Sequence, residues 1–217
     1  GGKASLLDAW PCLLDRTAVS GIDTHYFHQA VWAMRHIREQ AAAEHVDIGS
    51  DVNFVGMLTT ITSVTFIDIR PLQLTIPNFT GKAGSITALP LADNSVASLS
   101  SLHVIEHIGL GRYGDPIDPT GPERAASEIK RVLRPGGRAY VSTPIGRARV
   151  QFNGQRVFAA QEIPSLFAGL SVSSFSMVDA RGVFHERAHL DQMNITEEGA
   201  GMDCGLGMYV LEKRVAA

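Results

Sequence analysis

Short apolar runs alternate with amphipathic stretches along most of the chain. Apolar residues that recur every three or four positions predict helices, and short β-branched runs bounded by turn residues predict buried strands. The predicted helices span residues 23–43, 51–61, 123–133 and 162–167. The predicted strands span residues 46–49, 64–69, 96–104, 138–143, 171–178 and 206–212, with a weaker one within 78–90.

Strands that alternate with helices in this way indicate βαβ units, which assemble into a parallel sheet covered by helices on both faces. In such folds ligands bind outside the carboxyl ends of the strands. The chemically informative residues are therefore expected directly after the strands. We expect residues 45–217 to form one globular domain of this kind, with the N-terminal helical segment 1–44 packed on its core.

Composition places the chain among ordinary globular proteins. It has 217 residues, of which 45% are hydrophobic and 19% are charged, and its mean hydropathy is +0.05. These values exclude a disordered chain. The net charge of −3 makes the protein a poor partner for nucleic acid or for an anionic membrane surface, but it does not exclude small-molecule ligands.

Two cysteines, Cys12 and Cys204, lie at opposite ends of the chain and belong to no Cys-x-x-Cys pair. They exclude a disulfide scaffold and favour a reducing compartment. No uninterrupted apolar run reaches the roughly 18–20 residues that a membrane span needs. The opening residues lack the charged and apolar regions of a signal peptide, so a cytoplasmic location is expected.

The loop after the first predicted strand carries the first sign of a ligand. Asp47 and Gly49 stand there, and Asp68 ends the next strand, nineteen residues after Gly49. An ionised carboxylate at about that spacing can accept hydrogen bonds from both hydroxyls of a ribose. The alternative is that Asp47 and Asp68 only cap a helix and a turn.

The same loop argues against a dinucleotide. A pyrophosphate needs three loop glycines, of which Gly49 is the one present, and Asp51 at the start of the next helix would repel it. The loop therefore favours an adenosine-type ligand that carries no phosphates. S-adenosylmethionine fits this description, because its amino group and sulfonium are cationic and tolerate a nearby carboxylate.

Five segments, taken in order, resemble the class I S-adenosylmethionine-dependent methyltransferases. They are Val46-Asp47-Ile48-Gly49, Phe66-Ile67-Asp68-Ile69-Arg70, Ile86-Thr87-Ala88-Leu89-Pro90-Leu91-Ala92-Asp93-Asn94-Ser95-Val96, His103-Val104-Ile105-Glu106-His107-Ile108 and Arg131-Val132-Leu133-Arg134-Pro135-Gly136-Gly137. The resemblance implies a Rossmann-like α/β fold with a mostly parallel seven-stranded sheet, helices on both faces and an antiparallel closing strand. The string H-V-I-E-H-I-G-L-G-R-Y-G-D-P, residues 103–116, is similar to a little-characterised bacterial branch of that family.

The resemblance also implies where the cofactor would bind. Asp68 would hold the ribose, and Ile69 would pack on the adenine. Ser85 stands where the family usually places an acidic residue, so the adenine contact would rest on the backbone. The implied cofactor-binding residues are Asp47, Gly49, Ser50, Asp68, Ile69, Ser85, Ile86 and Leu102.

Candidate general bases follow the strand that ends near Leu102. His103, Glu106 and His107 stand there, and imidazole titrates near neutrality, so either histidine could take a proton from an acceptor hydroxyl. The alternative is that His103 is a packed strand-end residue, while Glu106 and His107 hold the following loop. A divalent metal bound by these groups and Asp115 stays open but is not favoured, because no ligand triad with a fixed spacing is visible.

These observations predict an S-adenosylmethionine-dependent methyltransferase that O-methylates a small-molecule or carbohydrate-type acceptor. The basic stretch 147–156 could steer an anionic substrate, although such a run is usually only a solvated face. His25 and Tyr26 lie on the first predicted helix, which often covers the cofactor pocket in the family, although core packing explains them as well.

Three rival functions stay open. A nicotinamide oxidoreductase would share the sheet architecture, but the glycine-poor loop argues against it. A non-catalytic or degenerate methyltransferase-like binding protein would keep the scaffold without the chemistry. Methylation of nucleic acid is disfavoured by the net charge of −3 and by the lack of a basic, aromatic-laced stripe.

Overall fold

Within the residues that the structure describes, eight strands form one mixed sheet and two more form a separate hairpin. The computed structural model describes residues 18, 20–151, 154–190 and 204–215, so Cys12 lies outside the described residues. The sheet strands are β1 (Glu44–Ile48), β2 (Ser63–Asp68), β3 (Phe79–Ala83), β4 (Val96–Leu102), β5 (Leu133–Ile145), β8 (Leu170–Val178), β9 (Phe184–His185) and β10 (Gly205–Lys213). The hairpin strands are β6 (Arg149–Gln151) and β7 (Gln155–Val157).

The strand order is β3-β2-β1-β4-β5-β10-β8-β9. The five strands from β3 to β5 are parallel to one another, whereas β10 runs antiparallel to both β5 and β8. The predicted α/β Rossmann-like sheet with an antiparallel closing strand is therefore present. The expectation of seven strands is wrong, because the chain turns back after β8 and adds the two-residue antiparallel strand β9 at the edge.

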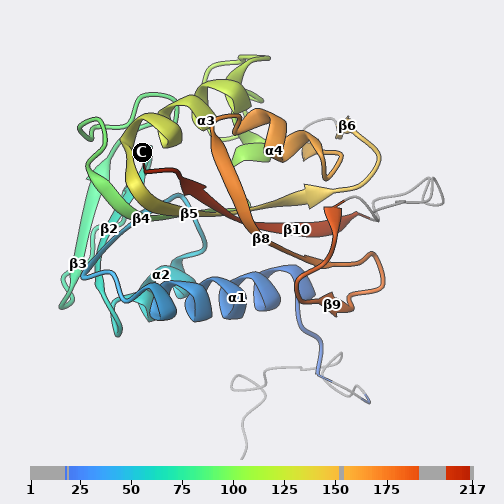
Figure 1. Ribbon diagram of the computed structural model, residues 1–217, viewed down its shortest axis with the longest axis horizontal. Coiled ribbons are helices and arrows are strands. Elements are labelled where there is room, and N and C mark those ends of the chain that lie inside the picture. The colour runs from blue at the N-terminus through green and yellow to red at the C-terminus, as the bar shows by residue number, and fades with distance from the viewer. Residues whose placement is uncertain (1–17, 19, 152–153, 191–203, 216–217) are drawn as a thin grey trace, which may run out of the picture.

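Helices cover both faces of this sheet, as Figure 1 shows, with α1 and α2 below it and α3 and α4 above it in that view. Those helices are α1 (Thr24–Gln40), α2 (Val52–Leu58), α3 (Gly121–Val132) and α4 (Glu162–Leu166), and a single 3-10 turn, η2, spans Ile105–His107. The four predicted helices are confirmed, and Asp23 caps α1 by accepting hydrogen bonds from the amides of His25 and Tyr26.

Two predicted boundaries differ from the structure for identifiable reasons. Helix α3 begins at Gly121 rather than residue 123, because Pro122 occupies the first turn, where a missing amide costs nothing. Strand β5 begins at Leu133 rather than residue 138 and runs through Pro135-Gly136-Gly137. A Cβ atom at Gly137 would lie 2.8 Å from the carbonyl oxygen of Val96, so a glycine lets β5 pass close to β4.

The core has one cluster on each face of the sheet. On the α1 side, Trp32, Ala33 and Ile37 pack with side chains of α2 and of the strands. On the other side, the buried residues of α3 and α4 pack against β4, β5 and β10. This packing holds α1 against the sheet and brings the carboxyl ends of β1, β2 and β4 to one edge, where the predicted site residues lie.

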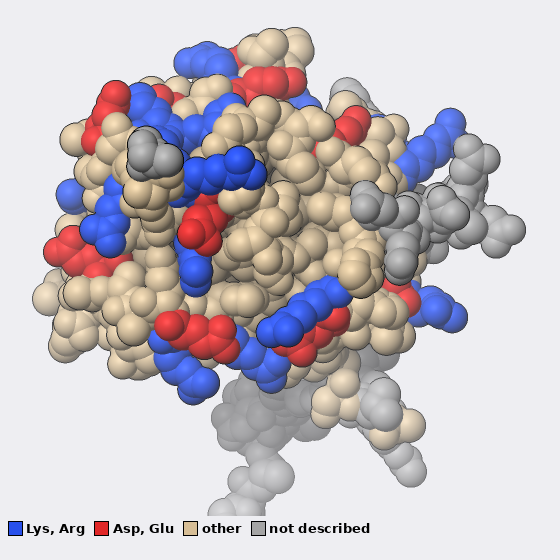
Figure 2. Space-filling view, viewed as in Figure 1, with Lys and Arg blue, Asp and Glu red and all other residues tan. Residues whose placement is uncertain are grey.

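Charged side chains are interspersed on the face of the molecule shown in Figure 2, and lysines and arginines do not gather there into one basic surface. Over the described ranges, the structure contains no helix long and apolar enough to cross a membrane.

Candidate functional site

The carboxyl ends of β1, β2 and β4 open into a cleft of about 660 Å³, which is also lined by the loop 109–120. This volume lies in the ordinary range for a small-molecule site. The structure brings seven of the eight predicted cofactor-binding residues to the wall of this cleft. They are Gly49, Ser50, Asp68, Ile69, Ser85, Ile86 and Leu102.

Gly49 leaves the space in front of Asp68 open. Its backbone has φ of +68°, a left-handed conformation that favours glycine, and its amide donates to the carbonyl of Ile67 at 3.1 Å. A Cβ atom here would lie 3.4 Å from both Oδ2 of Asp68 and the side chain of Val104. Oδ1 of Asp68 accepts from the amide of Arg70 at 2.6 Å. One carboxylate oxygen of Asp68 is thus used by the loop, and the other faces the space that Gly49 leaves.

Asp51 caps helix α2 at the cleft. Its Oδ1 accepts hydrogen bonds from the amides of Asn53 (3.0 Å) and Phe54 (3.3 Å). The amides that would bind a pyrophosphate are therefore occupied by a carboxylate, and the charge of Asp51 repels phosphates. This geometry supports the expectation of a phosphate-free ligand.

Asp47 lies behind the cleft rather than in its wall. Its carboxylate has no exposed surface and accepts hydrogen bonds from the amide of Ser50, at 3.0 Å, and from the hydroxyl of Ser100. Burial raises the pKa of Asp47 to about 6. Asp47 therefore orients the loop that carries Ser50, and its expected contact with a cofactor stays a prediction.

His45 continues this buried network on the side away from the cleft. Its ring nitrogens lie 2.8 Å from the hydroxyls of Ser98 and Ser100. Burial lowers the pKa of His45 to about 3, so its ring is neutral at physiological pH. Nothing in the sequence pattern distinguished His45 from an ordinary strand residue.

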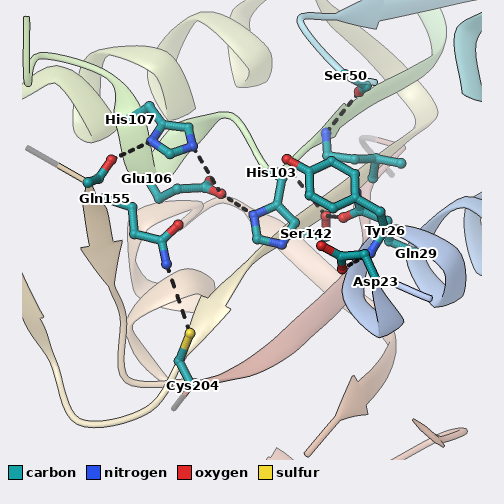
Figure 3. Close-up of polar contacts among 12 residues, drawn as sticks. Asp23, Tyr26, Gln29, Ser50, His103, Glu106, His107, Ser142, Gln155 and Cys204 are labelled. Atoms are coloured by element: carbon teal, nitrogen blue, oxygen red, sulfur yellow. Dashed lines mark hydrogen bonds and ion pairs between the residues drawn. The ribbon is translucent and has the colours of Figure 1, made fainter. Parts of the chain in front are cut away.

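Ser50 ties the loop after β1 to the end of β4. Its hydroxyl accepts a hydrogen bond from the amide of Leu102 at 3.0 Å (Figure 3). The amide of Leu102, one of the implied cofactor-binding residues, is therefore already paired. On the opposite wall of the cleft, Ser85 occupies the position where the family usually has an acidic residue. Its hydroxyl lies 2.9 Å from the hydroxyl of Thr87.

His103 and Glu106 form a close pair. Nδ1 of His103 lies 2.5 Å from Oε1 of Glu106, whose side chain is completely buried. The other ring nitrogen, Nε2, points away from Glu106 in Figure 3; it is buried and has no hydrogen-bond partner among the described residues. His103 has φ of +58°, and its amide donates to the carbonyl and the hydroxyl of Ser142. Non-glycine residues rarely adopt this conformation, and those that do are found disproportionately at functional sites.

The N-terminal end of α1 covers the imidazole of His103. The ring of Tyr26 stacks on it at 5.2 Å between centroids, and the ring of His25 does so at 5.8 Å. Burial and the nearby Glu106 raise the pKa of Tyr26, while burial and His103 lower that of His25. Tyr26 also lines the cleft, as expected for a helix that covers the pocket.

His107 is engaged elsewhere. Its Nδ1 lies 3.0 Å from the carbonyl oxygen of Gly154, in the turn of the β6–β7 hairpin, and its Nε2 is 3.9 Å from Oε1 of Glu106. Burial lowers the pKa of His107. Of the three predicted catalytic residues, the structure therefore joins His103 and Glu106 as a pair and uses His107 to hold the hairpin.

A second cavity of about 380 Å³ adjoins the cleft. The two share Tyr26, His103, His107 and Tyr113 in their linings, so the His103 pair lies at their junction. The second cavity also receives residues that sequence reasoning missed, because they come from four distant segments. They are Asp23, Arg112, Gln155 and Cys204.

The basic stretch 147–156 does not face this cavity through its arginines. Arg149 and Arg156 line a separate groove beside α4, and Arg156 donates to the carbonyl of Ile108 at 2.5 Å. Asp115, weighed as a metal ligand, instead accepts from the amides of Gly109 and Tyr113 and shapes the loop. Among the described residues, no group of three or more His, Cys, Asp or Glu side chains is arranged to hold a metal ion.

Solved structures of similar fold were found. A S-adenosylmethionine-dependent methyltransferase from Methanosarcina mazei has a TM-score of 0.58 at 16% identity, over 84% of this chain and 98% of that one. A S-adenosylmethionine-dependent methyltransferase from Aquifex aeolicus has a TM-score of 0.50 at 14% identity, over 82% and 88%. SpnF, named as a cyclase, has a TM-score of 0.63 at 16% identity, over 87% and 82%. These TM-scores show a shared Rossmann-like methyltransferase fold, which does not determine the reaction.

A search of curated proteins found no match to the chain. One family model matches residues 46–198, which is most of the chain and includes the residues that line the cleft except Tyr26, the His103–Glu106 pair and the β6–β7 hairpin. Its description names Caenorhabditis, so the expected bacterial branch stays a prediction. On this match, the chain belongs to the family described as Caenorhabditis protein of unknown function, DUF268.

Proposed function

We propose that the protein is an S-adenosylmethionine-dependent methyltransferase that methylates a hydroxyl of a small-molecule or carbohydrate-type acceptor. The observation that carries the proposal is the junction of two cavities at the His103–Glu106 pair. One cavity suits a phosphate-free nucleoside, and the other leaves room for an acceptor.

The residues of the cleft fit the proposed cofactor. The open oxygen of Asp68 suits the ribose hydroxyls, and Ile69 and Ile86 offer apolar contacts to an adenine. The carboxylate of Asp51 disfavours phosphate-bearing nucleotides but tolerates a cationic ligand. Bound in this cleft, S-adenosylmethionine would supply an electrophilic methyl group on a positively charged sulfur.

His103 is the proposed general base. Nε2 of His103 would take the proton from the acceptor hydroxyl, and the oxygen of that hydroxyl would then receive the methyl group that the cofactor supplies. Glu106 holds Nδ1–H and stabilises the imidazolium that results. A displacement with a good leaving group mainly requires that the reactants are aligned and that water is excluded. Asp47 and Ser50 hold the loop that aligns the cofactor, and the N-terminal end of α1 excludes water.

Calorimetry tests the proposal directly. S-adenosylhomocysteine, the product, is titrated into the wild-type protein, with NAD as the control ligand. Binding of S-adenosylhomocysteine without binding of NAD is expected, because the Asp51 cap refuses a pyrophosphate. If the folded protein binds neither ligand, the result would favour the alternative function, a non-catalytic relative of the methyltransferases.

A further inference from the structure

The second cavity contains a positive charge that no carboxylate of the described residues neutralises. Arg112 lines this cavity, and its Nη1 donates to the carbonyl of Gly154 at 2.9 Å. Its guanidinium also lies over the ring of Tyr113, 5.1 Å from the centroid. Arg70, which lines the cleft, lies over the same ring at 4.8 Å and likewise has no ion pair among the described residues. Four other arginines form ion pairs with aspartate or glutamate, namely Arg124, Arg131, Arg138 and Arg181.

Arg112 is exposed, and its Nη1 also lies 3.4 Å from Nδ1 of His107. These contacts position its guanidinium without neutralising it. A carbonyl and an aromatic face leave its Nε–H and the second amino group available, and a guanidinium binds a carboxylate or phosphate through two parallel hydrogen bonds. The one carboxylate in the lining, Asp23, caps α1 through its Oδ1, which accepts from two amides. The lining therefore carries one negative and one positive charge, and an anionic group is expected at Arg112 rather than beside Asp23.

Aromatic rings and an amide form much of the remaining lining. Tyr26, His25 and Tyr113 supply rings, and Gln155 supplies an amide that can bind hydroxyls. Figure 3 shows Gln155 and Cys204 on the other side of His103 from Ser50, which belongs to the cleft. Apolar ring faces combined with polar groups match a sugar, which has apolar C–H faces and a rim of hydroxyls.

From this arrangement, and resting on the proposed function, we infer that the acceptor is a hydroxylated ring compound carrying a carboxylate or a phosphate. Arg112 binds the anionic group, and a ring hydroxyl meets Nε2 of His103. A uronic acid and a sugar phosphate are the two sources of this chemistry. Arg112 is thus assigned as the residue that selects charged over neutral acceptors.

Saturation-transfer NMR on protein loaded with S-adenosylhomocysteine tests the inference with glucuronate, glucose 6-phosphate and glucose as probes. At least one anionic probe should bind tighter than glucose by on the order of tenfold to a hundredfold, the scale of a charge-assisted hydrogen bond. The tighter of the two anions identifies the source as a carboxylate or a phosphate.

Two variants test whether Arg112 causes the preference for anionic probes. R112M should bind both anions no better than glucose, and R112K should recover part of the difference. R134M is the matched control, because Arg134 is an exposed arginine near the start of β5, at the opposite edge of the sheet from the site. It should behave as wild type.

The outcomes separate this inference from the proposed function. If S-adenosylhomocysteine binds but the anions show no advantage, or if R112M keeps the advantage, the acceptor assignment is overturned and the methyltransferase proposal stands. If S-adenosylhomocysteine fails to bind, the proposed function fails; an Arg112-dependent preference for anions in the unloaded protein would still support the site.

Discussion

The buried carboxylate of Glu106 holds one side of the His103 imidazole, with 2.5 Å between Oε1 and Nδ1. A carboxylate in this position accepts a hydrogen bond from Nδ1–H, which leaves Nε2 as the ring nitrogen that can take a proton. Glu106 itself is not among the residues lining either cavity, so it acts through His103. The pair therefore has the geometry of an oriented general base.

Removing the imidazole should slow methyl transfer without loosening the cofactor. H103A is expected to lower kcat by about 10²–10⁴-fold, the usual contribution of a general base. Steady-state kinetics with the acceptor selected by NMR, together with S-adenosylhomocysteine calorimetry, measure the two effects. E106Q should also lower kcat and should change its pH profile, because the tautomer is no longer fixed. A wild-type rate in H103A would remove His103 as the base.

The carboxylate of Asp68 should account for a defined part of cofactor affinity. D68A is expected to weaken S-adenosylhomocysteine binding by about 1–3 kcal/mol, the cost of lost hydrogen bonds to a charged group. Titration calorimetry gives this value. D93A is a suitable control, because Asp93 is an exposed aspartate that pairs with Arg131 outside the cleft. Equal affinity in D68A and D93A would refute the ribose assignment.

The buried network of Asp47 and His45 should give two opposed contributions to stability between about pH 4 and pH 6. The raised pKa of Asp47, about 6, means that the folded protein binds this proton more tightly than the unfolded chain does. Its contribution to stability is therefore lost as pH rises toward 6. The lowered pKa of His45, about 3, acts in the opposite sense, because the unfolded chain binds that proton more tightly.

D47N separates these contributions. D47N lacks the stabilisation by Asp47 that wild type loses as pH rises. Its free energy of unfolding relative to wild type should therefore increase from pH 4 to pH 6 by on the order of 2–3 kcal/mol. Urea unfolding at a series of pH values measures the difference. A difference that stays constant with pH would contradict the raised pKa of Asp47.

His107 should matter for acceptor binding more than for chemistry. Its Nδ1–H donates to the carbonyl of Gly154, and Arg112 donates to the same oxygen, so both side chains hold the hairpin turn beside the second cavity. H107A should raise KM for the acceptor by about tenfold, the scale of one hydrogen bond, with a smaller change in kcat. A fall in kcat as large as that of H103A would instead make His107 the base.

Much of the fold followed from the sequence, because long periodic segments such as 23–43 and 123–133 carry a strong signal. Strands β6, β7 and β9 did not, since two or three residues are too few for a pattern to emerge. At the site, Gly49 and Asp68 were recognisable because the chain itself places them after strands. The partners of His103 were harder to predict, because its left-handed backbone conformation and its contact with Glu106 leave no mark on the sequence pattern.

The second cavity could not be found from the sequence. Its lining comes from the start of α1, the loop after η2, the hairpin and the start of β10, and only the strand order brings these segments together. Arg112 carried no signal of its own, whereas the basic stretch 147–156 did, and its arginines lie elsewhere. Local charge density therefore did not point to Arg112, the residue that we propose binds the anion.

The stack of Tyr26 and His25 over His103 also affects what happens when no acceptor is present. A water molecule deprotonated at Nε2 would itself attack the methyl group, and methanol would form in an idle cycle. Because that nitrogen is buried beneath α1, solvent does not reach it while Tyr26 and His25 stay stacked on the imidazole. Spontaneous breakdown of the cofactor on the enzyme should accordingly be slow, and shortening the Tyr26 side chain should accelerate it.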